Sequence, residues 1–292
     1  MTYSIENEYL SVTISSTGAE LISAVNKKDK TEYIWQGNQK YWTGHSPIMF
    51  PICGRLFEGK YTYRNKSYEL GCHGFAKLQE FELFSAKETS VSLKLVSNDE
   101  TRKNYPFDFE LLVTYTLKDS TLDVSFKVKN TDSNELIFGI GGHPAFNVPF
   151  SKNEKFEDYF VSFDKKAMAI RVDLSDTCFC TGNDKPYMED GTQDIPLRHE
   201  MFDNDAIFLY NIPKSVTLKS QSSKHSVKMT FKDMKYLGLW HKPKTNAPFV
   251  CIEPWNSIPS YDGIVDDLQT KKEMVHLPSG YSSKVSYQIE FK

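Results

Sequence analysis

Glu253 is the carboxylate whose sequence context most favours acid–base chemistry. It follows the apolar run 249–252 and precedes Pro254 and Trp255. Such a run predicts a buried strand, and because proline lacks a backbone donor we expect the strand's ladder to end there. A carboxyl group at a partly dry strand end has its charged form disfavoured, which suits a general base near neutral pH. A salt-bridged structural glutamate fits the same segment equally well.

Two histidines have related contexts. His143 follows the apolar segment 137–140 and a double glycine, and it precedes Pro144. His73 lies between two nearby glycines, which leave the backbone free to present the imidazole outward. Either ring also fits a structural role, bonded to a backbone carbonyl. A histidine and a carboxylate at two strand ends nevertheless form an acid–base pair, so each supports Glu253 as part of a site.

Arg55 and Asp205 complete the candidate set. Arg55 follows a glycine in the apolar segment 41–59, which glycines and prolines interrupt, and a guanidinium there needs an anionic partner. Asp205 directly precedes the apolar run 206–209, with Asp203 as an alternative two residues away. A structural ion pair and a turn cap are the ordinary roles of these side chains. All five candidates lie beside a break in a β segment.

The motifs exclude several kinds of chemistry. The sequence has no Gly-x-Ser-x-Gly elbow for acyl transfer and no glycine-rich loop that opens a helix to hold phosphates. Cys178, Cys180 and His199 lack a fourth ligand and the usual zinc spacing. We therefore expect no metal and no other cofactor. Proton transfer on a small polyol leads the remaining reactions, with Trp255 and Phe146 as flat apolar faces for a sugar ring.

The elements that must position these residues are predicted to be β-strands. Apolar residues alternate with polar ones over 107–117 and again over 122–128, which predicts a long antiparallel hairpin, and 91–95 adds a third strand. Residues 10–25 read as another hairpin and 285–291 as a last strand, while the only helix expected is a short one near 262–273. Without a linker or a repeat, the chain reads as one all-β domain over 1–292.

Composition narrows the partners and the compartment. The 35 Lys and Arg residues against 38 Asp and Glu residues give no basic excess for nucleic acid. No apolar run is long enough to span a membrane, and the first residues do not form a signal peptide. Five cysteines without a CxxC pair favour free thiols. We expect a soluble cytoplasmic protein that binds a small molecule and neither nucleic acid nor membrane, with its oligomeric state open.

Four ordered motifs give the sequence a specific resemblance. They are Phe-Pro-Ile-Cys-Gly-Arg at 50–55, His-Gly-Phe-Ala at 73–76, Gly-His-Pro-Ala-Phe-Asn at 142–147 and Cys-Ile-Glu-Pro-Trp at 251–255. Over nearly its whole length the chain resembles the aldose 1-epimerase (galactose mutarotase) family, and within it the LacX-like branch. The resemblance implies a β-supersandwich of large antiparallel sheets with very little helix. It also implies an isomerase of hexose metabolism that interconverts the α and β anomers of a free sugar such as galactose.

The resemblance also assigns roles to the five candidates. Glu253 matches the general base that takes the proton from the anomeric hydroxyl, and His143 matches the general acid at the ring oxygen. His73 assists on the ring-oxygen side, while Arg55 and Asp205 bind sugar hydroxyls, and no cofactor is implied.

Three other functions stay open at this point. A hexose-6-phosphate mutarotase would use Arg55 and Lys77 as its cations. A glycosidase would use Glu253 and Asp205 as paired carboxylates. A non-catalytic sugar-binding protein would keep the pocket without the chemistry. The identity of the sugar depends on loop positions, such as those between 151 and 199, that sequence does not place.

Overall fold

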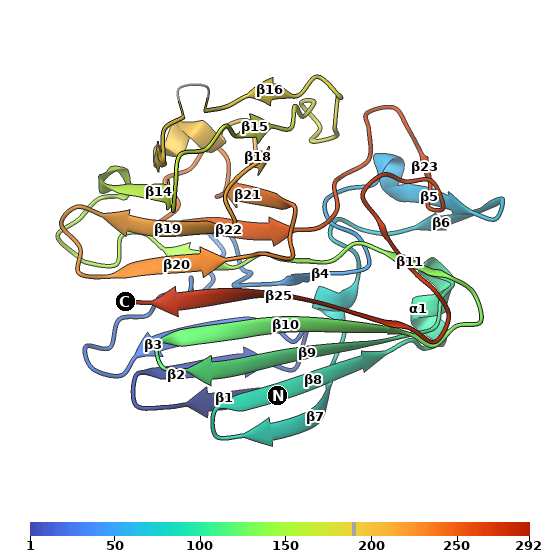
Figure 1. Cartoon of the computed structure of the whole chain (residues 1–292), viewed down its shortest axis with the longest axis horizontal. Helices are drawn as coiled ribbons and strands as arrows, with labels where there is room; N and C mark the ends of the chain where they lie inside the picture. Colours follow the sequence, from blue (N-terminus) through green and yellow to red (C-terminus); the bar gives the residue numbers. More distant parts are fainter. Residues whose placement is uncertain (189–190) are drawn as a thin grey trace.

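A computed structural model, which describes residues 1–188 and 191–292, shows a fold made almost entirely of antiparallel strands (Figure 1). The larger of its two main sheets has nine strands. Their order is β17 (Asp194–Pro196), β14 (Tyr159–Phe163), β19 (Ser215–Ser220), β20 (Ser226–Thr230), β25 (Ser282–Phe291), β10 (Thr121–Asn130), β9 (Phe109–Lys118), β8 (Ser90–Val96) and β7 (Glu82–Lys87). The predicted all-β class, the long hairpin and the last strand are confirmed.

The second main sheet has eight strands. Its order is β16 (Lys185–Pro186), β15 (Ile170–Arg171), β18 (Ile207–Tyr210), β21 (Tyr236–Trp240), β22 (Phe249–Trp255), β12 (Gly141–Gly142) and β4 (Ile48–Met49), and β13 (Ala145–Asn147) also pairs with β22. The sheet carries Glu253 on β22, while His143 lies between its strands β12 and β13. Every residue of β22 is buried, which explains why its sequence is apolar throughout instead of alternating.

Three small sheets and a few short helices complete the described part of the chain. The small sheets are β1 (Thr2–Glu6), β2 (Leu10–Ser15) and β3 (Leu21–Asn26); β23 (Asp266–Asp267), β5 (Lys60–Tyr63) and β6 (Lys66–Glu69); and β11 (Leu136–Phe138) with β24 (Val275–Leu277). The 3₁₀ helices are η1 (Phe57–Gly59), η2 (Ala76–Leu78), η3 (Phe156–Asp158) and η4 (His199–Phe202). The pairing of β2 with β3 confirms the predicted first hairpin.

The helix prediction is wrong in its position. Residues 262–273 form turns and the two-residue strand β23, and Gly263 has a φ of +73° that a helix does not allow. The α-helix of the described residues, α1, lies instead at Asp99–Asn104. Its start is defined by Asn98, whose side chain accepts the backbone N–H groups of Glu100 and Thr101. That cap was the sequence signal for a helix at this point.

The two main sheets share one hydrophobic core. Leu111 and Val113 of β9 belong to the same buried cluster as Leu237 of β21 and Ile252 of β22. Contact between the layers is close at β12, where a Cβ on Gly142 would lie 2.6 Å from the Tyr287 hydroxyl of β25. Glycine is therefore required beside His143, because any side chain there would push the layers apart.

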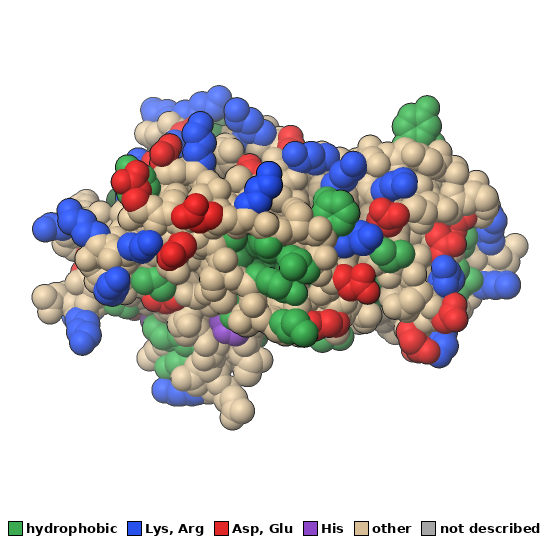
Figure 2. All heavy atoms as spheres, turned by 90° about the horizontal axis from the view of Figure 1, so that it is seen from below, with side chains coloured by type: hydrophobic (Ala, Val, Ile, Leu, Met, Phe, Trp, Pro, Cys, Tyr) green, Lys and Arg blue, Asp and Glu red, His purple; other side chains and the backbone are tan. Residues whose placement is uncertain are grey.

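The surface has a mixed charge. On the face seen in Figure 2, basic and acidic side chains are interspersed, and hydrophobic side chains gather near its middle. This distribution agrees with the near-balanced composition. Among residues 1–188 and 191–292, no helix has the length and apolar character required to cross a membrane.

Candidate functional site

All five candidate residues line one pocket. Arg55, His73, His143, Asp205 and Glu253 come together around a cavity of about 200 Å³. This volume is below the usual range for drug-sized ligands and suits one small molecule such as a single sugar ring. Residues separated by about two hundred positions in the chain thus form one concave site, which is the arrangement that an active site requires.

Glu253 lies within β22 and not at its end. The strand continues through Pro254, which stands opposite Leu237, to Trp255. The N–H groups of Ile252 and Asn256 donate to the carbonyls of Pro144 and Ile140 on the neighbouring segment. Every second N–H group of a strand points to the same side, so a residue with an N–H at position 254 would direct it toward residues 142–143. The neighbouring segment leaves the sheet there, between β12 and β13, so the missing N–H of Pro254 costs no ladder hydrogen bond. The expectation that Pro254 ends the ladder is therefore wrong.

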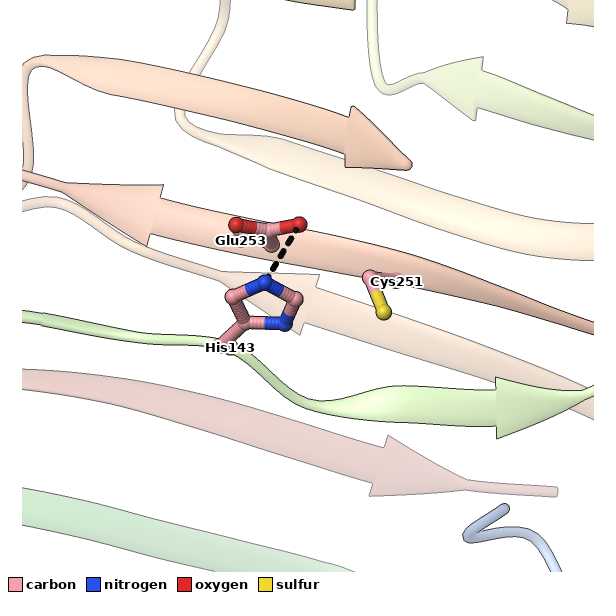
Figure 3. Close-up of side chains that lie close together, drawn as sticks. All are labelled: His143, Cys251 and Glu253. Carbon is pink, nitrogen blue, oxygen red and sulfur yellow. Dashed lines mark ion pairs between the residues drawn. The ribbon is translucent and has the colours of Figure 1, made fainter. Parts of the chain in front are cut away.

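The imidazole of His143 faces the carboxylate of Glu253 (Figure 3), and both residues line the pocket. His143 Nε2 lies 3.3 Å from Glu253 Oε1, while Trp255 Nε1 donates to Glu253 Oε2 at 3.1 Å. Neither His143 Nδ1 nor Glu253 Oε1 has a hydrogen bond, although both atoms are buried. Buried polar atoms without partners are rare, and here they mark positions that a ligand can satisfy.

Burial shifts the proton affinities of this pair in opposite directions. Burial raises the pKa of Glu253 well above its usual value, although the Trp255 hydrogen bond opposes the rise. Burial lowers the pKa of His143 to about 4. Both shifts disfavour the charged form, so burial favours a neutral carboxyl group beside a neutral imidazole over an ion pair. Such a pair can accept a proton on one group and release one from the other.

His73 is fixed as a hydrogen-bond donor toward the pocket. Its Nδ1 accepts the Gly54 N–H at 3.1 Å, so the proton of the neutral ring lies on Nε2. Burial and the neighbouring His143 lower the pKa of His73 well below its usual value, which keeps the ring neutral. His73 itself has a φ of +64°, and Gly74 follows at +70°, where a Cβ would lie 2.3 Å from the Phe50 carbonyl. The glycine thus permits the turn that presents the imidazole.

Arg55 and Asp205 form the polar wall of the pocket. The Arg55 guanidinium lies 3.6 Å from Asp205 Oδ2, and it also donates to the Thr177 carbonyl at 3.5 Å. The Cys178 thiol donates to the same carboxylate oxygen of Asp205. Asp203 does not line this pocket, and its carboxylate accepts the backbone N–H of Lys244. The structure therefore places Asp205, and not Asp203, beside the other candidates.

Tryptophans supply the apolar walls. Trp42, Trp240 and Trp255 all line the pocket, and the Trp42 ring lies 5.1 Å from the His143 ring, centroid to centroid. Phe146 is fully buried in the core and does not line the pocket, so the expectation that it offers a face to a sugar is wrong. Trp42 and Trp240 were missed because nothing in their local sequence places them near residue 143.

Lys77 is a further pocket residue with a free charge. It lies in η2 and lines the pocket beside His73, and its positive charge lowers the pKa of both His73 and His143. Within residues 1–188 and 191–292, its ammonium group has no hydrogen bond and no carboxylate at ion-pair distance. A cation without a partner in a pocket can bind an anionic group of a ligand.

The cysteine and histidine set considered from the sequence does not form a metal site. Cys178 bonds to Asp205, Cys180 bonds to the Pro259 carbonyl, and His199 bonds to His241. All five cysteines are free thiols.

Comparisons with known proteins agree on one family. The family model described as aldose 1-epimerase matches residues 1–269. The chromosomal protein LacX of Lactococcus lactis subsp. lactis is 33% identical over 297 residues, which cover 99% of each chain. A galactose mutarotase related enzyme of Lactobacillus acidophilus superposes with a TM-score of 0.96 at 34% identity, covering 100% of this chain and 97% of that one.

A galactose mutarotase-like protein of Lactobacillus casei ATCC 334 superposes with a TM-score of 0.95 at 32% identity, and both chains are covered completely. These matches confirm the family and the β-supersandwich fold inferred from the four motifs. The chain therefore belongs to the aldose 1-epimerase family and is an isomerase of the sugar-mutarotase type.

Proposed function

We propose that this enzyme interconverts the α and β anomers of a free hexose by opening and reclosing the sugar ring. The observation that supports this reaction is the Glu253–His143 pair, with a carboxylate oxygen and a ring nitrogen 3.3 Å apart in the pocket lining. Ring opening needs one group to accept a proton while another donates one. A carboxyl group beside an imidazole meets that need without any redox change.

Glu253 is the general base in this proposal. Its Oε1 has no hydrogen bond, whereas Oε2 is held by Trp255, so Oε1 is the atom free to take the proton of the anomeric hydroxyl. His143 is the general acid, which gives its proton to the ring oxygen as the C1–O5 bond breaks. Rotation about the C1–C2 bond and reclosure on the other face of the carbonyl give the other anomer, and each group regains its original protonation.

The pKa directions suit this cycle. The reactive state before ring opening is the ion pair of carboxylate and imidazolium, which burial makes the less stable form, and after ring opening the pair is a carboxylic acid and a neutral imidazole. Burial raises the pKa of Glu253 and lowers that of His143, so it favours the neutral pair that accompanies the open-chain sugar. Burial therefore assists the ring-opening step, in which both groups lose their charge.

The remaining pocket residues position the sugar. His73 Nε2–H is available to the ring-oxygen side, and the Arg55 guanidinium and the Asp205 carboxylate can bind hydroxyl groups at the opposite wall. The Trp42 and Trp240 rings provide apolar surface for the C–H faces of a pyranose. Loss of a positioning residue should raise KM more than it lowers kcat.

Polarimetry of freshly dissolved α anomers tests this proposal. Glucose, galactose and their 6-phosphates are each followed to anomeric equilibrium with and without the enzyme. Acceleration of at least one free hexose is the expected result. If no free or phosphorylated aldose equilibrates faster with the protein, the proposed reaction is wrong.

A hexose 6-phosphate is the second candidate substrate, and Lys77 is the observation that favours it. Arg55 already has Asp205 as a partner, whereas the Lys77 ammonium has no carboxylate at ion-pair distance among the described residues. A phosphate group would supply that partner. Competitive inhibition of galactose mutarotation by galactose 6-phosphate, but not by inorganic phosphate, would favour the phosphorylated substrate over simple anion binding.

We also propose that the chain works as a single cytoplasmic domain. One buried cluster includes residues from Ile5 near the N-terminus to Phe291 near the C-terminus, which supports one folding unit. The five free thiols suit a reducing compartment. Limited proteolysis that yields one resistant core, and cell fractionation, test these two statements.

A further inference from the structure

Cys251 is a buried nucleophilic group for which the proposed reaction has no use. It lies on β22 two residues before Glu253, so the two side chains leave the same face of the strand. Its thiol is completely buried, and Figure 3 shows it beside the His143 imidazole. A free cysteine packs like a small apolar residue, so packing accounts for its burial but makes no use of its thiol.

The three side chains have the spacing of a metal-ligand set. The Cys251 sulfur, one ring nitrogen of His143 and one carboxylate oxygen of Glu253 all lie within 4.8 Å of one another. Around a tetrahedral Zn²⁺ with ligand distances of about 2.0–2.3 Å, the nitrogen and oxygen ligands lie about 3.3 Å apart. The sulfur ligand lies about 3.6 Å from each of them. The 3.3 Å between His143 Nε2 and Glu253 Oε1 already fits, and separations of up to 4.8 Å within the set require the side chains to shift by up to about an ångström.

Charge balance also permits an ion at this place. A dication bound by a thiolate, a carboxylate and a neutral imidazole forms a neutral unit. Any proton on the sulfur or on the carboxylate oxygen leaves to solvent as that atom becomes a ligand. A site in the interior therefore gains no net charge, and the unpaired Glu253 Oε1 receives a partner.

The geometry points to His143, Cys251 and Glu253 as a binding site for one thiophilic divalent cation of the Zn²⁺ or Cd²⁺ class. A thiolate and an imidazole select such ions over Mg²⁺ and Ca²⁺, which prefer six or more oxygen ligands. Three protein ligands leave a fourth position on the pocket side for water. Because the ion occupies both proton-transfer groups, it inhibits mutarotation, and this consequence rests on the proposed function.

Cadmium titration tests the site directly. Binding is followed by the ultraviolet thiolate-to-cadmium charge-transfer band and by calorimetry, which need no enzymatic activity. The wild type, Cys251→Ser and Cys251→Ala are compared with the matched control Cys180→Ser, a buried thiol outside the pocket. Thermal unfolding and near-ultraviolet circular dichroism of each variant establish that it is folded.

We expect one Cd²⁺ per chain in the wild type and in Cys180→Ser. Both Cys251 variants should lose the charge-transfer band and bind at least about tenfold more weakly, since even residues that only orient a ligand affect affinity by about 10–100-fold. Absence of the band in the wild type overturns the site. A band that persists in folded Cys251 variants also overturns it, and assigns cadmium to other thiols, such as Cys72 and Cys178 at the pocket wall.

The inhibition assay separates this inference from the proposed function. Zn²⁺ should stop wild-type mutarotation at concentrations at least about tenfold below those needed for the Cys251 variants. Cadmium binding without any metal-free mutarotase activity would leave the metal site standing and refute the proposed reaction. If the wild type binds Zn²⁺ and keeps its full mutarotase activity, the ion is not an inhibitor.

Discussion

Replacement of Glu253 by glutamine isolates proton transfer from sugar binding. The amide has nearly the shape of the carboxyl group and keeps an oxygen that can accept the Trp255 indole N–H, which now donates to Oε2 at 3.1 Å. The amide is unable to take a proton from a hydroxyl group near neutral pH. The pocket walls formed by Arg55, Asp205 and the tryptophans are untouched. We therefore expect Glu253→Gln to bind the sugar and to lose catalysis.

The expected loss follows from the geometry of the pair. Glu253 Oε1 is the buried carboxylate atom that faces His143, and no other carboxylate among the described residues is at ion-pair distance from that histidine. General acid–base catalysis contributes about 10²–10⁴-fold, so kcat should fall by that factor, which corresponds to about 3–5 kcal/mol in activation free energy. Since the substitution removes an interaction used in the transition state, KM should change by less than about threefold.

Polarimetry measures this loss after subtraction of the spontaneous rate of mutarotation. Calorimetric titration with the same sugar supplies the binding control, because a variant that neither binds nor turns over would only report a damaged pocket. His143→Asn serves as the partner variant, and the double variant should be little worse than either single one, since the two groups act as a unit. Retention of more than about a tenth of wild-type kcat by folded Glu253→Gln would refute Glu253 as the base.

Three further predictions follow from the same structure. Asp205→Asn should raise KM about tenfold or more, because it removes a charged hydrogen-bond partner of a substrate hydroxyl. The control Asp203→Asn should leave KM unchanged, since Asp203 lies outside the pocket. Equal effects of the two substitutions in steady-state kinetics would contradict the placement of Asp205 in the pocket. Lys77→Met should weaken inhibition by a hexose 6-phosphate about tenfold and leave inhibition by the unphosphorylated sugar unchanged. If inhibition by both sugars weakens to the same extent, Lys77 does not contact the phosphate. Folding raises the pKa of Glu253, so above pH 4.5 the folded protein binds more protons than the unfolded protein, and the stability that this carboxyl group contributes falls as pH rises toward its folded pKa. In urea unfolding between pH 5 and 7, the stability of Glu253→Gln should therefore rise relative to wild type by up to about 1.4 kcal/mol per pH unit. A difference that stays constant with pH would contradict the raised pKa.

Local patterns in the sequence were sufficient for the long strands. The alternating apolar and polar residues over 107–128 correctly predicted β9 and β10. Each strand buries one face against a continuous core, so alternate side chains are buried and the side chains between them are more exposed. The same logic failed for 262–273, where weak amphipathicity suggested a helix. There Lys271 is buried and donates to the Pro259 carbonyl, and it also pairs with Asp266, so tertiary contacts override the local preference.

The sequence alone determined which residue types were available for proton transfer and, through its four motifs, the family to which the chain belongs. The glycines around His73 and His143 were informative because backbone conformation and close packing depend on the local residue itself. Only the tertiary structure decided that both histidines line one pocket with Glu253, that Asp205 and not Asp203 enters that pocket, and that Trp42 replaces Phe146 as an aromatic wall. The physical reason is that distances and dielectric surroundings arise from segments far apart in the chain, and these set both the pairing and the pKa of buried groups.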